Sequence, residues 1–240
     1  MKRPRAILLA SRESLSPIAG EPLLARTVRQ LRGQGVGEVT VVARGGGREL
    51  QEALGWASGV VLIEEKAAAG SGIGALCLGL DHTSGSVLVV EGGVALDEPA
   101  AAEIATAARS GESIWFTEGR LRPGQEGGIL KADATGAVCE LRHLERYERR
   151  FDRHRKLLGV LAIGAKQRPL YQRLLREAAA FLRPPHYLSP WADSLRALPC
   201  SAYNLAHRRV ANLGSPEGRR RGGELFGAGA VVPAELAEVG

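Results

Sequence analysis

The stretch Ala6-Ile-Leu-Leu-Ala10 is followed, after only six residues, by Pro17-Ile-Ala-Gly-Glu-Pro-Leu-Leu24 and then by Ala25-Arg-Thr-Val-Arg-Gln-Leu31. The first run is entirely apolar and predicts a strand that is buried on both faces. The last run carries apolar residues at helical spacing and predicts an amphipathic helix. A buried strand that leads into such a helix is the repeating unit of α/β proteins.

The same alternation continues toward the middle of the chain. Apolar runs predict strands at residues 38–43, 59–63, 86–90 and 113–117, and helical patterns lie at 22–32, 48–54, 71–80 and 98–110. Repeated β-α-β units with continuous apolar strands predict a Rossmann-like α/β fold, with a mostly parallel central sheet and helices on both faces.

The pattern changes after residue 127. Two short runs at 128–131 and 137–141 flank Asp133-Ala-Thr-Gly136 and predict a small added β-hairpin. Beyond it we expect a strand at 157–163, helices at 167–182 and 187–198, short strands within 203–213, and a last helix that starts at Ser215. We expect a single domain over residues 1–226 and a loose tail over residues 227–240.

Composition narrows the classes of function. The 240 residues are 45% hydrophobic and 24% charged, with a net charge of +6 and three cysteines that lie far apart. We expect a cytoplasmic protein, because no signal peptide is evident and no apolar run approaches the ~20 residues of a membrane helix. Arginines gather in residues 142–156, but aromatic residues are only 5% of the chain. We therefore expect no nucleic-acid partner.

Four segments, in this order, resemble the nucleotidyltransferases that join a nucleoside triphosphate to a sugar phosphate, an alditol phosphate or choline phosphate. They are Pro17-Ile-Ala-Gly-Glu-Pro-Leu-Leu24, Val36-Gly-Glu-Val-Thr-Val-Val42, Ser86-Val-Leu-Val-Val-Glu-Gly-Gly-Val-Ala-Leu-Asp97 and Val210-Ala-Asn-Leu-Gly-Ser-Pro-Glu-Gly218. The resemblance implies a glycosyltransferase-A-like fold of the nucleotide-diphospho-sugar transferase type.

The resemblance also implies a site from which this sequence departs at three places. In the family a long glycine-rich loop after the first strand holds the triphosphate, and two aspartates coordinate Mg²⁺. Here residues 11–16 contain no glycine, and Arg12 is their only basic residue. The two aspartate positions correspond to Gly93 and Asn212. Losing two carboxylates from one divalent site removes most of its charge complementarity.

Candidate site residues follow from the same alignment of segments. Arg12, Glu91 and Asn212 are the candidates for catalysis. The candidates for nucleotide binding are Ser11, Arg12, Gly70, Ser71, Gly72, Gly92 and Gly93. Trp191 and Asp193 are candidates on the acceptor side, although Trp191 also suits a helix anchored against the core. Asp97 equally suits the N-cap of the following helix, and Gly70–Gly74 equally suits a structural turn.

Two functions stay open. The sequence favours a non-catalytic or regulatory relative, which would bind a nucleotide or phosphorylated small molecule and work with a protein partner or as a homo-oligomer. The alternative is an active nucleotidyltransferase with a rebuilt site, joining a CTP-like nucleotide to a small phosphorylated alcohol or sugar. Mg²⁺ is expected only in that case, and no set of residues predicts a metal site by itself.

Overall fold

The computed structural model describes residues 3–55, 59–65, 72–181 and 185–227. A mixed sheet of nine strands forms the centre of this part, in the order β10-β9-β11-β6-β1-β4-β5, with β8 paired to β11 and β12 paired to β8. These strands are β1 (Arg5–Ala10), β4 (Val39–Ala43), β5 (Val60–Glu64), β6 (Val87–Glu91), β8 (Ile114–Arg120), β9 (Gly127–Ala132), β10 (Val138–Leu144), β11 (Arg155–Ile163) and β12 (Ser201–Asn204).

Parallel strands make up the middle of the sheet. Strand β1 lies between β4 and β6, and Ile7 is in register with Thr40 on one side and Val89 on the other. Strand β11 then joins β6 in the antiparallel direction and connects the parallel strands to the hairpin of β9 and β10. The carboxyl ends of β1, β4, β5 and β6 therefore meet at one edge.

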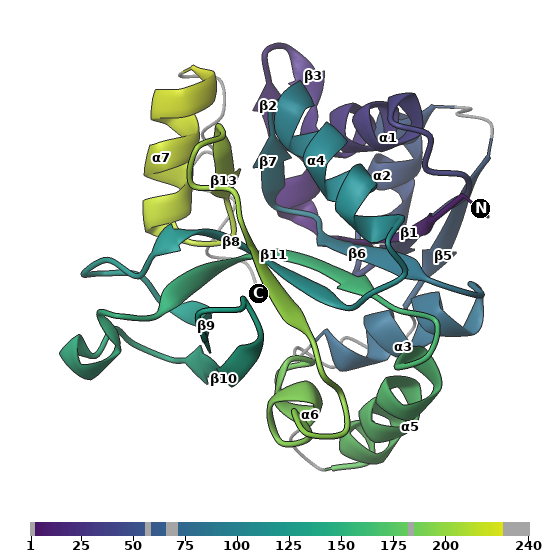
Figure 1. Cartoon of the computed structure of the whole chain (residues 1–240). Helices are drawn as coiled ribbons and strands as arrows, with labels where there is room; N and C mark the ends of the chain where they lie inside the picture. Colours follow the sequence, from purple (N-terminus) through teal and green to yellow (C-terminus); the bar gives the residue numbers. More distant parts are fainter. Residues whose placement is uncertain (1–2, 56–58, 66–71, 182–184, 228–240) are drawn as a thin grey trace.

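Helices cover both faces of the sheet, as the β-α-β pattern predicts (Figure 1). The helices and 3₁₀ turns are η1 (Arg12–Leu15), α1 (Leu23–Gly33), α2 (Gly47–Leu54), α3 (Ile73–Asp81), α4 (Glu98–Ala108), η2 (Arg149–Phe151), α5 (Arg168–Ala179), α6 (Ser189–Ala192) and α7 (Pro216–Phe226). Helices α1, α2 and α4 pack on one face, and α3, α5 and α6 pack on the other.

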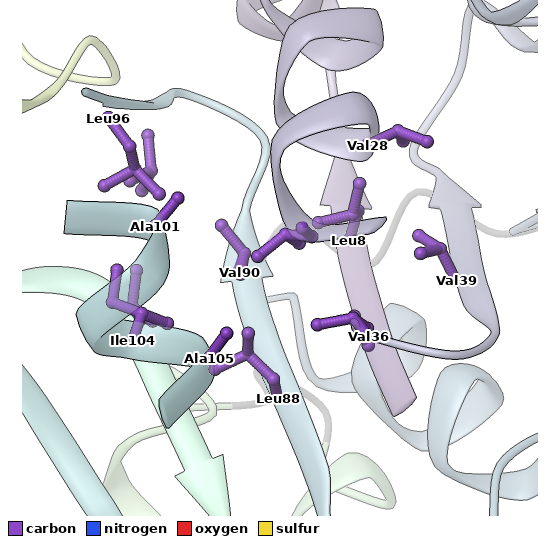
Figure 2. Close-up of a cluster of buried hydrophobic side chains, with 14 of the residues drawn as sticks. Leu8, Val28, Val36, Val39, Leu88, Val90, Leu96, Ala101, Ile104 and Ala105 are labelled. Atoms are coloured by element: carbon purple, nitrogen blue, oxygen red, sulfur yellow. The ribbon is translucent and has the colours of Figure 1, made fainter. Parts of the chain in front are cut away.

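Each face has its own apolar cluster. In the first, Leu8 and Val90 of the sheet meet Val28 of α1 and Ile104 of α4 (Figure 2). Burying one such side chain contributes about 1.5–3 kcal/mol. Alternate residues of the same strands, such as Ile7, face the second cluster. This is why the strands are apolar throughout rather than at every second residue.

Two small sheets lie beside the main one. Strands β2 (Pro17–Ile18) and β3 (Glu21–Pro22) form a hairpin whose turn residues, Ala19 and Gly20, both have positive φ angles of 52° and 81°. Strand β7 (Val94–Leu96) pairs with β13 (Val210–Asn212). The second pairing brings together two segments that are far apart in the sequence.

The predicted elements agree with the structure in most places. The hairpin around residues 133–136 is confirmed, and Asp133 accepts a backbone hydrogen bond from Thr135 at 2.8 Å. The helix expected over 187–198 was wrong in extent, because only Ser189–Ala192 is helical. The proposed tail lies outside the described residues, apart from Gly227. No helix in the described ranges combines the length and apolar character needed to cross a membrane.

Candidate functional site

The candidate site lies at the edge where the parallel strands end. Glu91 is the last residue of β6, Ser11 follows β1, and Arg44 follows β4. Open α/β sheets bind ligands outside the carboxyl ends of their strands, where the loops leave a crevice. Three of the candidates predicted from the sequence, Ser11, Glu91 and Gly92, lie at this edge.

Gly93 and Asn212 lie next to each other. The pairing of β7 with β13 sets Asn212 opposite Val94, and a Cβ atom on Gly93 would lie 3.1 Å from Asn212 Oδ1. The two positions that the resemblance assigns to aspartates therefore converge in space, although they are more than a hundred residues apart. Neither position carries a carboxylate.

Glu91 is held by neutral hydrogen-bond donors. The hydroxyl of Tyr187 donates to Glu91 Oε1 at 2.5 Å, and Asn212 Nδ2 donates to Glu91 Oε2 at 2.6 Å. Burial, followed by the nearby carboxylate, raises the pKa of Tyr187 well above its usual value, so the hydroxyl keeps its proton. We refer to Glu91, Tyr187 and Asn212 as the Glu91 cluster.

Further hydrogen bonds fix the orientation of Asn212. Its Nδ2 also donates to the carbonyl of Leu158 at 3.2 Å, and its Oδ1 accepts from the backbone N–H of Gly214 at 3.0 Å. The oxygen and the nitrogen of the amide thus both have partners. Asn212 therefore acts as a connector between β11, β6 and the loop that leads to α7.

Gly159 leaves space for this cluster. It lies in β11 with φ of 86°, and a Cβ atom there would come within 2.8 Å of Asn212 Nδ2 and still closer to Glu91 Oε2. An L side chain would be strained at this φ and would displace the carboxylate. A glycine inside an otherwise apolar strand is thus explained by the close approach of the Glu91 cluster.

The short segment after β1 folds on itself. Residues 12–15 form the 3₁₀ turn η1, in which the backbone N–H of Ser11 donates to the buried hydroxyl of Ser14 at 3.0 Å. A Cβ atom on Gly92 would meet Ser14 Oγ and would lie 2.8 Å from the carbonyl of Leu9. The turn therefore packs tightly against Gly92 and uses several of its polar groups internally. The backbone N–H groups of Ser14 and Ser16 donate to the carbonyls of Ser11 and Glu13, so these two are not available to a phosphate.

A cavity of about 450 Å³ opens beside the Glu91 cluster. All three members of the cluster line it, together with residues of β8, β9, β10, β11 and the first turn of α7. On its wall Arg221 forms an ion pair with Glu118 at 2.9 Å, and both side chains are largely buried. Lys156 also lines the cavity, and burial lowers its pKa. The volume is in the range of small-molecule sites.

Comparison with known proteins decides the family. A family model described as the MobA-like NTP transferase domain matches residues 10–210. The chain belongs to the MobA-like NTP transferases. The expected kind of family and the α/β fold are thereby confirmed. None of the curated proteins matches the sequence.

Solved structures of NTP transferases share the fold at low sequence identity. The CTP:phosphocholine cytidylyltransferase from Streptococcus pneumoniae has a TM-score of 0.75 and 16% identity, and the match covers 92% of this chain and 97% of that chain. A UDP-glucose pyrophosphorylase complexed with UDP-glucose has a TM-score of 0.74 and 11% identity, over 99% and 100% of the two chains. A putative glucose-1-phosphate thymidylyltransferase from Bacillus anthracis has a TM-score of 0.73 and 12% identity, over 93% and 95%.

The residues of this MobA-like NTP transferase do not fit a magnesium ion at the Gly93–Asn212 position. Mg²⁺ prefers carboxylate oxygens in near-octahedral geometry, and Gly93 offers no side chain. Asn212 Oδ1 already accepts from Gly214, and Glu91 brings one carboxylate where the resemblance implies two aspartates. Among the described residues no group of three or more His, Cys, Asp or Glu side chains could hold a metal.

The nucleotide-binding candidates have different surroundings. Gly72 precedes α3 with φ of 71°, and a Cβ atom on it would lie 3.5 Å from the ring of Tyr187. The side chain of Arg12 is exposed and makes no hydrogen bond or ion pair with another described residue. Gly70 and Ser71 lie outside the described residues. The structure thus brings Gly72, Gly92 and Gly93 to one edge, while their role stays a prediction.

The acceptor-side candidates lie away from the cavity. Trp191 is fully buried, its indole N–H donates to the carbonyl of Leu198 at 2.9 Å, and its ring meets Trp115 edge-on at 5.8 Å. Asp193 lines a separate hollow near α6 and β10. Neither residue lines the 450 Å³ cavity. These placements fit the alternative interpretation of Trp191 as a core anchor.

Asp97 has a structural role. Its Oδ1 accepts from the backbone N–H of Ala100 at 2.8 Å, and its Oδ2 accepts from that of Arg209 at 3.2 Å. The carboxylate therefore caps α4 and joins it to the segment before β13, as the alternative interpretation expected.

Three residues that line the cavity, Gly159, Lys156 and Tyr187, are not among the candidates predicted from the sequence. Gly159 had a usable signal, since a glycine inside a strand often marks a close approach of neighbouring groups. Lys156 was recognised only as part of an arginine-rich stretch, although it faces the cavity. Tyr187 had no signal, because its contact with Glu91 joins residues 96 positions apart.

Proposed function

We propose that this MobA-like NTP transferase is a non-catalytic member of its family. In this proposal it keeps the fold as a small-molecule-binding or regulatory subunit and does not carry out metal-dependent nucleotidyl transfer. The observation that carries the proposal is the Glu91 cluster. Its one carboxylate, Glu91, is held by Tyr187 and Asn212, and Gly93 and Asn212 stand at the positions where the resemblance implies aspartates.

Two further features support the proposal. The turn over residues 11–16 is too short and too occupied by its own hydrogen bonds to cradle a triphosphate. The transfer step joins two anionic reactants, so it depends on positive charge that is held in place. Arg12 alone, exposed and without the fixed partners that would orient it, is a weak substitute for a loop, a lysine and a metal.

Pyrophosphate release tests the proposal. The full chain is incubated with each nucleoside triphosphate, with Mg²⁺ or Mn²⁺, and with a panel of sugar, alditol and choline phosphates. We expect release no faster than in a blank without protein. Sustained release that disappears in Arg12→Ala, but not in the control Arg173→Ala on the exposed face of α5, would contradict the proposal. That outcome would support an active enzyme with a rebuilt site.

A further inference from the structure

The wall of the cavity carries an excess of negative charge. Five glutamates line it, against one lysine and one arginine. The arginine, Arg221, is already paired with Glu118. A cleft lined mainly by one sign of charge concentrates counter-ions of the opposite sign. This is the reverse of what a site for a nucleoside triphosphate requires when no metal offsets the phosphates.

The histidines on the wall do not offset this charge at neutral pH. His143 and His186 stack with ring centroids 4.3 Å apart and an interplanar angle of 22°. Burial lowers the pKa of His186 to about 4 and also lowers the pKa of His143. Both rings are therefore neutral near pH 7. Burial lowers the pKa of Lys156, and the negative charges of three glutamates raise it: Glu118, Glu91 and Glu126. The ammonium group of Lys156 therefore already interacts with several carboxylates.

Glu91 has acceptor capacity to spare. Tyr187 and Asn212 supply one hydrogen bond to each of its oxygens, whereas a carboxylate offers about four lone-pair sites. Both of these partners are neutral, so they do not compensate the charge of Glu91. Leu157, Leu188 and Trp115 add apolar surface to the same cavity. The wall thus combines a fixed carboxylate with places for an alkyl chain.

We propose that the cavity binds a small molecule that carries a primary ammonium group, with Glu91 as the carboxylate that receives it. The inference rests on the proposed function, because a metal-triphosphate complex would need the same space. An ammonium group brings positive charge to this edge of the sheet and donates charge-assisted hydrogen bonds to Glu91. The alkyl part of the ligand lies against Leu157 and Leu188.

A pair of ligands with the same chain length tests the charge requirement. The full chain is titrated with n-butylammonium and, separately, with n-butanol, and binding is followed by chemical-shift changes in NMR spectra. We expect n-butylammonium to bind at least about tenfold more tightly, since only it can pair with a carboxylate. Equal affinity for the two ligands, or no binding of n-butylammonium, would overturn the proposal.

Two variants should change the binding of n-butylammonium in opposite directions. Glu91→Gln keeps the size of the side chain and removes its charge, so the preference for n-butylammonium should fall to about twofold or less. Lys156→Met removes a competing positive charge, so affinity for n-butylammonium should rise about threefold or more. Glu112→Gln, at an exposed turn away from the cavity, is the control and should change neither value.

The direction in which Lys156→Met changes affinity distinguishes cation binding from anion binding. Loss of the lysine charge should strengthen the binding of a cation and weaken that of an anion. Pyrophosphate is titrated without divalent metal as the competing probe. Tighter binding of pyrophosphate than of n-butylammonium, weakened in Lys156→Met, would overturn the inference and assign the cavity to anions. These titrations contain no nucleoside triphosphate. If n-butylammonium does not bind, only the inference about the ligand is overturned. The proposed function is contradicted only by turnover in the pyrophosphate-release assay.

Discussion

The parallel centre of the sheet and the edge where its strands end agree to different degrees with what the resemblance implies. In the centre, Leu8, Val41 and Val90 are no more than 1% exposed, and they pack between helices as the apolar sequence predicts. At the edge, Gly93 and Asn212 stand where the resemblance places aspartates. The nearby carboxylate of Glu91 accepts a hydrogen bond from the hydroxyl of Tyr187.

The difference shows that packing and chemistry impose separate requirements on one chain. The centre needs only apolar side chains of suitable volume on strands and helices. The edge needs particular charged groups at particular positions, and a single change there removes a function without removing the fold. The polar side chains of Glu91, Tyr187 and Asn212 at this edge have hydrogen-bond partners, so the edge keeps an ordered structure.

The largest expected effect is in the packed region. Trp191→Ala should lower the free energy of unfolding by about 3–5 kcal/mol, because it empties a fully buried aromatic site. Urea unfolding measures the loss, and the folded variant should still bind n-butylammonium more tightly than n-butanol, because Trp191 supplies no polar group to the cavity. If Trp191→Ala loses little stability but no longer binds n-butylammonium, Trp191 contributes to ligand binding, as the acceptor-side interpretation expects.

Gly159→Ala tests the link between the two regions. The added Cβ would displace Glu91 and Asn212 at a residue with φ of 86°, so we expect a loss of about 2–4 kcal/mol in urea unfolding. Gly136→Ala is a matched control, with φ of 87° and no atom within 4 Å of the added Cβ. Its loss should be about 1 kcal/mol, from backbone strain alone. Similar losses in the two variants would mean that the Glu91 cluster does not constrain β11.

Asn212→Asp should be the next largest effect. It removes the amide that donates to Glu91 at 2.6 Å and puts a second carboxylate in its place. We expect a loss of about 2 kcal/mol at pH 7, from repulsion and a lost donor, and a smaller loss at pH 5, where the pair can share a proton. Asn204→Asp is the control. Asn204 Oδ1 accepts from the Ala206 N–H and the Thr117 hydroxyl, and an aspartate oxygen can accept the same two hydrogen bonds. A pH-independent loss at position 212 would contradict this account of the cluster.

The smallest expected effect concerns His186. Burial lowers its pKa from 6.5 to about 4 in the folded chain, so as the pH falls the unfolded chain takes up this proton first. Stability should therefore decrease between pH 6.5 and pH 4. Comparing urea unfolding at pH 7 and pH 5, we expect this decrease to be about 1 kcal/mol smaller in His186→Phe, after allowing for solvent screening. An equal decrease in both proteins would show that His186 does not titrate this way.

Most of the fold could be predicted from the sequence because its signals are local. Apolar runs such as Ala6–Ala10 and helical spacing such as that of residues 25–31 report burial directly. The hairpin at residues 133–136 has its own turn chemistry. The exceptions depend on tertiary packing. Tyr187 was expected to begin a helix, yet it lies before the short α6 and points its hydroxyl at Glu91.

The candidate site could be predicted only in part. The resemblance assigns residues 93 and 212 to one site, and the pairing of β7 with β13 brings the two positions together, while their role stays a prediction. It could not predict what replaces the aspartates, since that depends on side chains from β6, β11 and the segment before α6. Charge on the cavity wall comes from residues spread between positions 91 and 221, so no local pattern in the sequence reveals it.

A titration with Mn²⁺, followed by electron paramagnetic resonance, tests the central claim most directly. The account predicts that the wild type has no site with a Kd below about 1 mM, since Glu91 is a single carboxylate and neither Gly93 nor Asn212 adds a second one. The double variant G93D/N212D should gain a site at least about tenfold tighter than any in the wild type. Stoichiometric, tight binding of Mn²⁺ to the wild type that is lost in Glu91→Gln would contradict the claim.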